Sequence, residues 1–248
     1  MSFTICSITG NIHTRDNTNV TFNRADDLTY GGAISGFGSM TKSGEGTLTL
    51  TGNNKYNGVT TVNAGTLQIG DGGTTGSVSG YGLSVTPHIV NNGNVTFNRS
   101  DAYSYNGRIS GTGSLTKLGD GTLYLQGGLL TYTGGTTVNG GTLQINGAFT
   151  GDITNNANVA FGSSGLTPYT YEGVISGSGS LTKSGSGNLT LSGNNTYNGA
   201  TTISYGTLTV TGGLAYGDYA GNISNSGLLV FNQETDQTLS GIVSFNRQ

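Results

Sequence analysis

The first candidates for nucleophilic, proton-transfer and metal chemistry in this chain are its two histidines and one cysteine: His13, His88 and Cys6. The histidines precede related positions in two repeated segments, but nothing near them supplies a nucleophile or a third metal ligand at useful spacing. We therefore expect turn or surface roles for both. Cys6 could act as a nucleophile or link two chains, but within the run FTICSI a small buried residue of a terminal strand is the simpler interpretation.

Carboxylates are the other candidates for catalysis. Paired-acid glycoside hydrolysis needs two carboxyl groups that face each other across the scissile bond. Asp26 and Asp27 are adjacent, and neighbours on a strand point to opposite faces. Asp101 occupies a comparable place in a second repeat, where a third repeat has Leu166. A solvated loop is the favoured interpretation, but a carbohydrate-active β-helix enzyme stays open as an alternative.

Two further patterns could bind ligands. The run Asp71 to Gly73 is similar to one unit of a calcium-binding β-roll, but that motif has to recur and it occurs once here. Tyrosines in recurring Tyr-x-Gly turns could form a carbohydrate-stacking strip, although their fixed place favours packing at corners. These tyrosines are Tyr30, Tyr56, Tyr105, Tyr132, Tyr171 and Tyr197. The sequence therefore predicts no catalytic, cofactor-binding or metal-binding residue and no cofactor.

Composition indicates which elements must position these residues. Of 248 residues, 33% are hydrophobic and 8% are charged, with 46 glycines and 2 prolines. Disordered chains usually combine low hydrophobicity with high charge or many prolines, so disorder is not expected. Val, Ile, Leu, Phe and Tyr alternate with Thr, Ser and Asn, which is typical of short strands joined by tight turns. The fold class is predicted to be all-β.

Charge and hydropathy exclude several partners. A net charge of −3 offers no basic surface that could neutralise phosphates, so nucleic-acid binding is not expected. No apolar run approaches the ~20 residues that span a bilayer. The amino terminus lacks the charged and apolar segments of a secretory signal peptide. If the protein is exported, we expect the signal to have been removed or to lie outside this sequence.

Internal repeats organise the whole chain. The segment NVTFNR occurs twice, and NVAFGS and LLVFNQ are its third and fourth copies; their phenylalanines, 75, 64 and 70 residues apart, are Phe22, Phe97, Phe161 and Phe231. The extra length is expected to lie in an insertion at Gly70 to Pro87. We predict a single solenoid domain over residues 1–248, with repeats at about 10–70, 87–146 and 151–210 and a partial repeat at 221–248.

A smaller period inside each repeat suits one coil. Leu48 and Leu67 are 19 residues apart, and the runs TLTL and TLQI alternate apolar with polar residues. Such alternation places one apolar row inward, and stacked coils would align these leucines in a ladder. We expect a right-handed parallel β-helix of roughly a dozen coils, a rod about 50–60 Å long. Recurring Asn-Gly pairs such as Asn57 and Gly58 are expected to adopt the positive φ of tight corners.

The fixed order of these motifs resembles a known family. Three copies follow the pattern ISGxGSLTKxGxGTLTL, a Tyr turn, TTV and GTL, over Ile34 to Leu67, Ile109 to Leu143 and Ile175 to Leu208. This pattern resembles the autotransporter-associated β-strand repeat of type V secretion passenger domains. The resemblance implies a non-enzymatic structural or adhesive stalk, secreted or held at the bacterial cell surface, whose partner would be a ligand on a host or neighbouring cell.

The two ends suggest another function. Both are expected to form strands, and uncovered solenoid ends present unpaired strand edges that invite stacking. End-to-end self-association through the strands at 1–10 and 239–248, giving extracellular fibres, is therefore the main alternative.

Overall fold

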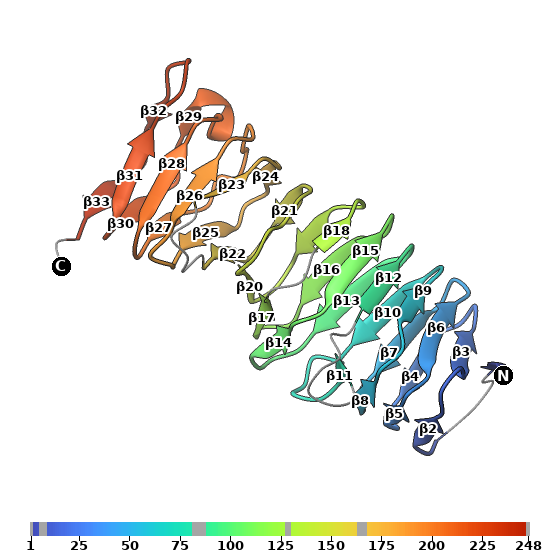
Figure 1. Cartoon of the computed structure of the whole chain (residues 1–248). Helices are drawn as coiled ribbons and strands as arrows, with labels where there is room; N and C mark the ends of the chain where they lie inside the picture. Colours follow the sequence, from blue (N-terminus) through green and yellow to red (C-terminus); the bar gives the residue numbers. More distant parts are fainter. Residues whose placement is uncertain (1, 5–8, 81–87, 127–129, 163–167, 247–248) are drawn as a thin grey trace.

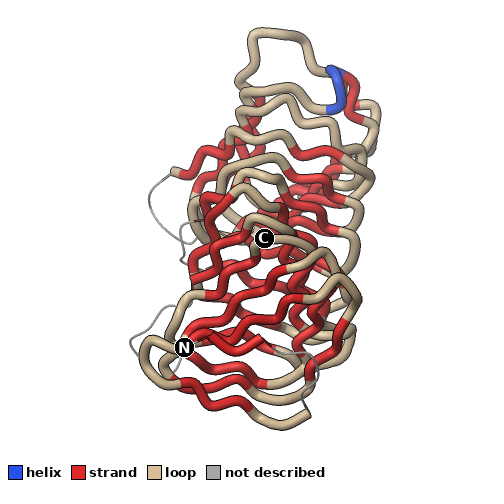
Figure 2. The backbone as a smooth tube through the Cα atoms, turned by 90° about the vertical axis from the view of Figure 1, so that its right-hand side faces the viewer, coloured by secondary structure: helices blue, strands red, loops and turns tan. Residues whose placement is uncertain are grey.

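A computed structural model describes residues 2–4, 9–80, 88–126, 130–162 and 168–246. Short strands and tight turns wind into a rod of stacked coils, about 11 turns long (Figure 1). All described strand pairs are parallel. The predicted all-β parallel solenoid is confirmed, and Figure 2 shows the strands of successive coils stacked along the rod.

Most turns contribute one strand to each of three faces, and an isolated bridge at Phe149 or Asn195 takes the place of a strand in two of them. The first face holds β2 (Ile12–Thr14), β5 (Ile34–Gly36), β8 (Asn53–Tyr56) and β11 (Ser77–Ser79), then β14 (Tyr103–Tyr105), β17 (Thr122–Leu125), β20 (Thr142–Ile145), β22 (Asn158–Phe161), β25 (Ser180–Lys183), β27 (Thr201–Ile203), β30 (Ile223–Asn225) and β33 (Val243–Phe245). The second holds β1 (Ser2–Thr4), β3 (Asn19–Asn23), β6 (Ser39–Ser43), β9 (Thr60–Val62), β12 (His88–Asn91), β15 (Arg108–Gly111) and β18 (Leu130–Tyr132), then β23 (Tyr169–Tyr171), β26 (Asn188–Leu191), β28 (Thr207–Val210) and β31 (Leu228–Phe231). The third holds β4 (Leu28–Tyr30), β7 (Thr47–Leu50), β10 (Thr66–Ile69), β13 (Asn94–Asn98), β16 (Ser114–Leu118), β19 (Thr136–Val138), β21 (Ile153–Asn155) and β24 (Ile175–Ser176), then β29 (Asp218–Tyr219) and β32 (Thr238–Leu239), with a short 3-10 turn, η1 (Ala215–Gly217).

Strand register confirms the leucine ladder. Leu48 of β7 pairs with Leu67 of β10, so the 19-residue spacing is one coil of the solenoid. The equivalent leucines of the next two repeats also pair across adjacent coils. Inward leucines, isoleucines and valines are almost fully buried and form one core along the rod. Stacking thus lets a chain poor in apolar residues bury them efficiently.

The sequence repeat is out of phase with the coil. From β3 to β13, which carry Phe22 and Phe97, the chain passes ten strands, one more than three full turns of three strands. Phe22 therefore lies on the second face and Phe97 on the third, while Phe161 lies on the first face and Phe231 is back on the second. Each repeat advances the pattern by one face around the rod.

Where one sheet ends and another begins on the same face, a side chain replaces the missing strand partner. The hydroxyl of Tyr103 accepts from the N–H of Val78 and donates to its carbonyl, both at 3.0 Å. Tyr169 does the same for Phe149, at 3.0 and 2.7 Å. These hydrogen bonds satisfy backbone groups that would otherwise be left without partners beside the core.

The prediction that Asn-Gly pairs at the corners adopt positive φ is wrong for Asn57 and Gly58. Among the described residues, positive φ at non-glycine positions is confined to Asn17, Ala215 and Tyr216, and Gly58 of an Asn-Gly pair has no positive φ. A Cβ on Gly58 would lie 2.4 Å from a carbonyl oxygen of the preceding coil. Close approach between stacked corners, rather than backbone torsion, requires glycine there.

The ends of the described chain form strands, as expected. β1 pairs with β3 near the amino end, and β33 pairs with β30 near the carboxyl end. The predicted insertion at Gly70 to Pro87 contributes β11, and its last seven residues, 81–87, lie outside the described part. No helix in the described ranges is long and apolar enough to cross a membrane.

Candidate functional site

The two histidines lie on the outer surface of different sheets. His13 Nδ1 is 3.1 Å from the hydroxyl of Ser35, and His88 Nε2 is 3.0 Å from that of Ser110. Ser35 and Ser110 occupy the same place in the ISG motif of successive repeats. Partial burial, with a smaller contribution from the charge of Arg108, lowers the pKa of His88. Each histidine thus makes a surface contact to a neighbouring coil, in agreement with the predicted surface roles.

The acidic candidates lie in exposed bends. The carboxylate of Asp26 is ion-paired with Arg24, whose hydrogen bond lowers the pKa of that carboxyl. Asp27 accepts a hydrogen bond from the N–H of Thr47, at 2.7 Å from Oδ1. The two side chains therefore have separate partners, and both are exposed, in agreement with the solvated-loop interpretation. Cys6 and Leu166 lie outside the described residues.

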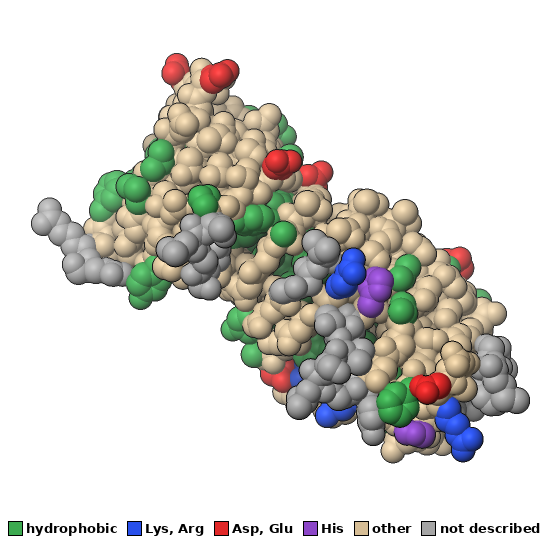
Figure 3. Space-filling model, viewed as in Figure 1, with side chains coloured by type: hydrophobic (Ala, Val, Ile, Leu, Met, Phe, Trp, Pro, Cys, Tyr) green, Lys and Arg blue, Asp and Glu red, His purple; other side chains and the backbone are tan. Residues whose placement is uncertain are grey.

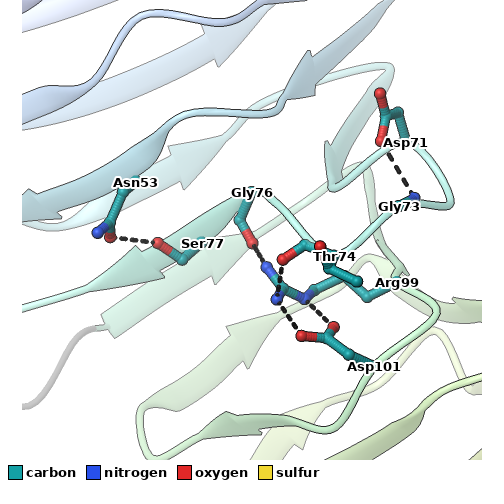
Figure 4. A network of polar contacts seen from close by, with 8 residues as sticks. All are labelled: Asn53, Asp71, Gly73, Thr74, Gly76, Ser77, Arg99 and Asp101. Atoms are coloured by element: carbon teal, nitrogen blue, oxygen red, sulfur yellow. Dashed lines mark hydrogen bonds and ion pairs between the residues drawn. The ribbon is translucent and has the colours of Figure 1, made fainter.

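Asp101 belongs to a clamp that holds the insertion (Figure 4). Arg99 donates to both carboxylate oxygens of Asp101, at 2.8 and 2.7 Å, and to the carbonyls of Thr74 and Gly76. The guanidinium also lies 5.0 Å from the centre of the Tyr103 ring. The hydrogen bonds from Arg99 lower the pKa of Asp101. Because Arg99 is bound to groups of the chain itself, this network fixes the loop between β10 and β11.

Asp71 also has a local role. Its Oδ1 accepts from the N–H of Gly73 at 3.2 Å, which closes a turn at the tip of the same insertion. Among the described residues, no three His, Cys, Asp or Glu side chains come together in a group that could hold a metal ion.

The recurring tyrosines pack inside the corners, as predicted. All six are almost fully buried, and burial raises the pKa of each phenol. Their hydroxyls find partners within the core: Tyr171 donates to the carbonyl of Gly151 at 2.6 Å, and Tyr132 lies 2.6 Å from the hydroxyl of Thr136. These tyrosines are not available to stack on a ligand.

Three buried lysines were missed by the sequence reasoning. Lys42, Lys117 and Lys183 end the [ML]TK motif of each repeat, and their relative exposures are 1, 2 and 0%. Each pairs in register with the phenylalanine of NVTF or, in the third repeat, NVAF, so its stem lies in the apolar row. The period-two alternation of the strand could have located them. Each lysine is two residues from an inward Met or Leu, which places it on the inward side of the strand.

Each ammonium group binds the carbonyl oxygens of two stacked turns. The Nζ of Lys117 donates to Leu118 at 2.6 Å, to Gly119 at 2.7 Å and to Gly140, one coil further, at 3.1 Å. Lys42 repeats this arrangement with three carbonyls, and Lys183 with two. Burial lowers the pKa of all three lysines, that of Lys117 to about 8. The lysines thus hold adjacent coils together at a corner where strand pairing is interrupted.

A surface hollow of about 480 Å³ lies on the third face near β29 and β32. Three successive coils line it, contributing residues 194–196, then Gly213, Tyr216 and Gly217 around η1, and residues 235–237 before β32. Tyr216 is 94% exposed beside it, and Ala215 and Tyr216 both have positive φ. The amide of Gln237 accepts from the N–H of Leu214 at 3.0 Å and donates to its carbonyl at 3.2 Å, which anchors the loop across the coils. No pattern in the sequence predicted this hollow.

The fold and its repeated lysine corner define a parallel β-solenoid built from degenerate repeats. The passenger-associated-transport-repeat matches three segments, residues 40–69, 115–145 and 181–210. Each match starts two residues before a buried lysine and ends with the strand that carries TLQI or TLTV. The chain therefore carries three passenger-associated transport repeats, which confirms the resemblance to autotransporter passengers; the outer boundaries of the repeats stay a prediction.

The chain is also similar in sequence to a curated autotransporter protein. The chain is 38% identical over 168 residues to the adhesin BmaC autotransporter of Brucella suis biovar 1 (strain 1330). The aligned region covers 57% of this chain and 5% of that protein, so the chain spans a small part of its relative's length. No solved structure matches the chain.

Proposed function

We propose that this chain is a non-enzymatic, adhesive segment of an autotransporter-like passenger, displayed at the bacterial surface as one solenoid domain. The three transport repeats carry the proposal, together with the similarity to a protein named as an adhesin. A rod with a polar exterior is suited to projecting a contact surface away from a cell. At about 11 turns and ~4.8 Å per coil, the rod is ~53 Å long.

The roles of the titratable side chains support a non-enzymatic function. Asp101 is held by Arg99, and the lysines and tyrosines that carry the largest pKa changes are buried in the corners. These structural contacts explain the altered pKa values of the residues, so no catalytic role is needed to explain them. A screen of purified chain against plant, bacterial and host polysaccharides should release no new reducing ends; reproducible release would contradict this part of the proposal.

Adhesion can be measured directly. Fluorescent beads coated with residues 1–248 should bind to cultured epithelial cells more than beads coated with the same chain after urea denaturation. Small-angle scattering of the free chain should give an elongated profile. Equal binding by native and denatured coatings would contradict an adhesive function that depends on the solenoid.

A second candidate function is end-to-end assembly. Phe245 of β33 pairs in register with Asn225 of the buried row, yet it is 72% exposed, as is Ile242. Leu228 of β31 is 56% exposed. Figure 3 shows hydrophobic side chains at this end of the rod. These exposed apolar side chains on and beside β31 and β33 favour packing against a strand edge of another copy of this chain.

Sedimentation velocity tests this assembly. Species larger than a monomer should appear as the concentration of the chain rises, and Phe245→Ser should abolish them. Tyr205→Ser is the matched control, because Tyr205 is exposed away from the end. Monomers at every concentration, or assembly unaffected by Phe245→Ser, would refute stacking through this end.

A further inference from the structure

The hollow beside η1 is formed by an insertion. In the second repeat, Ile153 follows the bridging residue Phe149 by four positions, whereas in the third repeat Ile223 follows the equivalent Leu214 by nine. The added residues form η1 and β29, and they place Tyr216 outside the wall of the solenoid. This coil therefore carries a surface feature that the second repeat lacks.

The backbone holds Tyr216 in an unfavourable conformation. Ala215 and Tyr216 have φ of 45° and 55°, a region that side-chain-bearing residues seldom occupy in succession. The turn is fixed on both sides, since Ala215 N–H donates to the carbonyl of Asn195 at 2.8 Å and Gly217 N–H donates to that of Leu214 at 2.9 Å. Such outliers concentrate at binding sites, where the surrounding structure enforces them.

Polar groups around the hollow are available to a ligand. Asn194 uses its amide oxygen to accept from the N–H of Gly213 at 3.1 Å, and within the described residues no hydrogen bond engages its NH₂ group. Within the described part of the chain, no hydrogen bond engages the side chains of Thr196, Asp236 or Tyr216. An exposed aromatic ring beside a carboxylate, an amide and a hydroxyl is a set that matches a sugar: the ring face attracts C–H groups, and the polar groups bind hydroxyls.

We propose that this hollow binds a neutral saccharide, with the pyranose ring stacked on Tyr216 and its hydroxyls held by Asp236 and Asn194. The volume of about 480 Å³ falls within the range of roughly 300–1,000 Å³ typical of small-molecule clefts. The only charged side chain in the lining is Asp236, and Figure 3 shows acidic side chains but no Lys or Arg at the tip of the molecule, where the loop before β32 lies. Like-charge repulsion disfavours sialylated or uronic-acid sugars.

This proposal rests on the adhesive function proposed above for its biological meaning, and the two can fail separately. Binding of lactose, cellotriose and chitotriose to the chain should be measured by saturation-transfer NMR and titration calorimetry, with 3′-sialyllactose as the anionic counterpart of lactose. At least one neutral sugar should bind, and sialyllactose should bind more weakly than lactose or not at all. If no neutral sugar binds, or sialyllactose binds better than lactose, the proposal is overturned, whether or not coated beads adhere.

Variants test the assignment of residues. Tyr216→Ala and Asp236→Asn should each weaken binding at least tenfold, while Tyr205→Ala, which removes an exposed tyrosine outside the hollow, should leave it unchanged. Tyr216→Gly keeps the positive φ without its strain, so it should lose binding while melting at the same or a higher temperature. Equal affinity in Tyr216→Ala and the unsubstituted chain would overturn the site.

Discussion

Replacing Lys117 by methionine should destabilise the solenoid, although the change removes a buried charge. The ammonium group donates to three carbonyl oxygens of two stacked turns, and methionine leaves all three without that donor. An acceptor left without its partner costs about 1 kcal/mol or more, which gives about 3 kcal/mol for the corner. Relief of the ammonium's desolvation offsets part of this cost. We expect a net loss of about 2 kcal/mol in the free energy of unfolding.

The loss should depend on pH in a defined direction. Burial lowers the pKa of Lys117 to about 8, from 10.5 in an unfolded chain. Between these values the unfolded state binds more protons, so the lysine's contribution to stability rises with pH across this window and falls as pH drops toward 8. The difference in stability between the unsubstituted chain and Lys117→Met should therefore be larger at pH 9.5 than at pH 7.5.

Urea titrations followed by tyrosine fluorescence at both pH values measure this difference. Lys55→Met is the matched control, because Lys55 is exposed on β8, and it should change stability by no more than about 0.5 kcal/mol. If Lys117→Met and Lys55→Met unfold at the same urea concentration, the ammonium does not hold the corner. A difference that shrinks from pH 7.5 to 9.5 would refute the pKa argument.

Three further changes probe other contacts. Asn195→Leu removes a buried amide that accepts and donates at 2.9 and 2.7 Å, and urea titration should show a loss of about 2–4 kcal/mol. Tyr171→Phe removes one hydrogen bond to a carbonyl of the preceding coil and should lower the free energy of unfolding by about 1 kcal/mol in the same assay. Gly52→Ala would place a Cβ 2.2 Å from a neighbouring carbonyl oxygen and should lower the melting temperature sharply, whereas Gly31→Ala, whose Cβ meets its nearest atom at 3.5 Å, should not; equal melting of the two would contradict the role given to close corner contacts.

The coil could be predicted because its signal is local and repeated. Period-two alternation in TLTL and TLQI fixes which side chains point inward, and the spacing of Leu48 and Leu67 measures one turn directly. The same rule places Lys117 inward, but a charged residue is ordinarily assigned to the surface unless its partners are known. Those partners are backbone carbonyls brought together by coil stacking, which no sequence pattern displays.

The hollow at Tyr216 was beyond sequence reasoning for a different reason. It combines segments from three coils and a turn whose left-handed torsions contradict the preferences of Ala215 and Tyr216. The six corner tyrosines could be assigned to the core because they recur at fixed places in the repeat, whereas Tyr216 occurs in an insertion that the second repeat lacks. A feature that departs from the repeat carries no periodic signal, and in this chain the proposed binding site is such a feature.

The phase difference between repeat and coil has a consequence for how such a chain can change. Removing or duplicating one repeat by recombination would shift all following residues along the axis and also rotate them to the next face of the rod. Only a change of three repeats would restore the original direction of Tyr216. The number of repeats would then set both the distance of a surface site from the point where the rod is attached and the face of the rod on which that site lies.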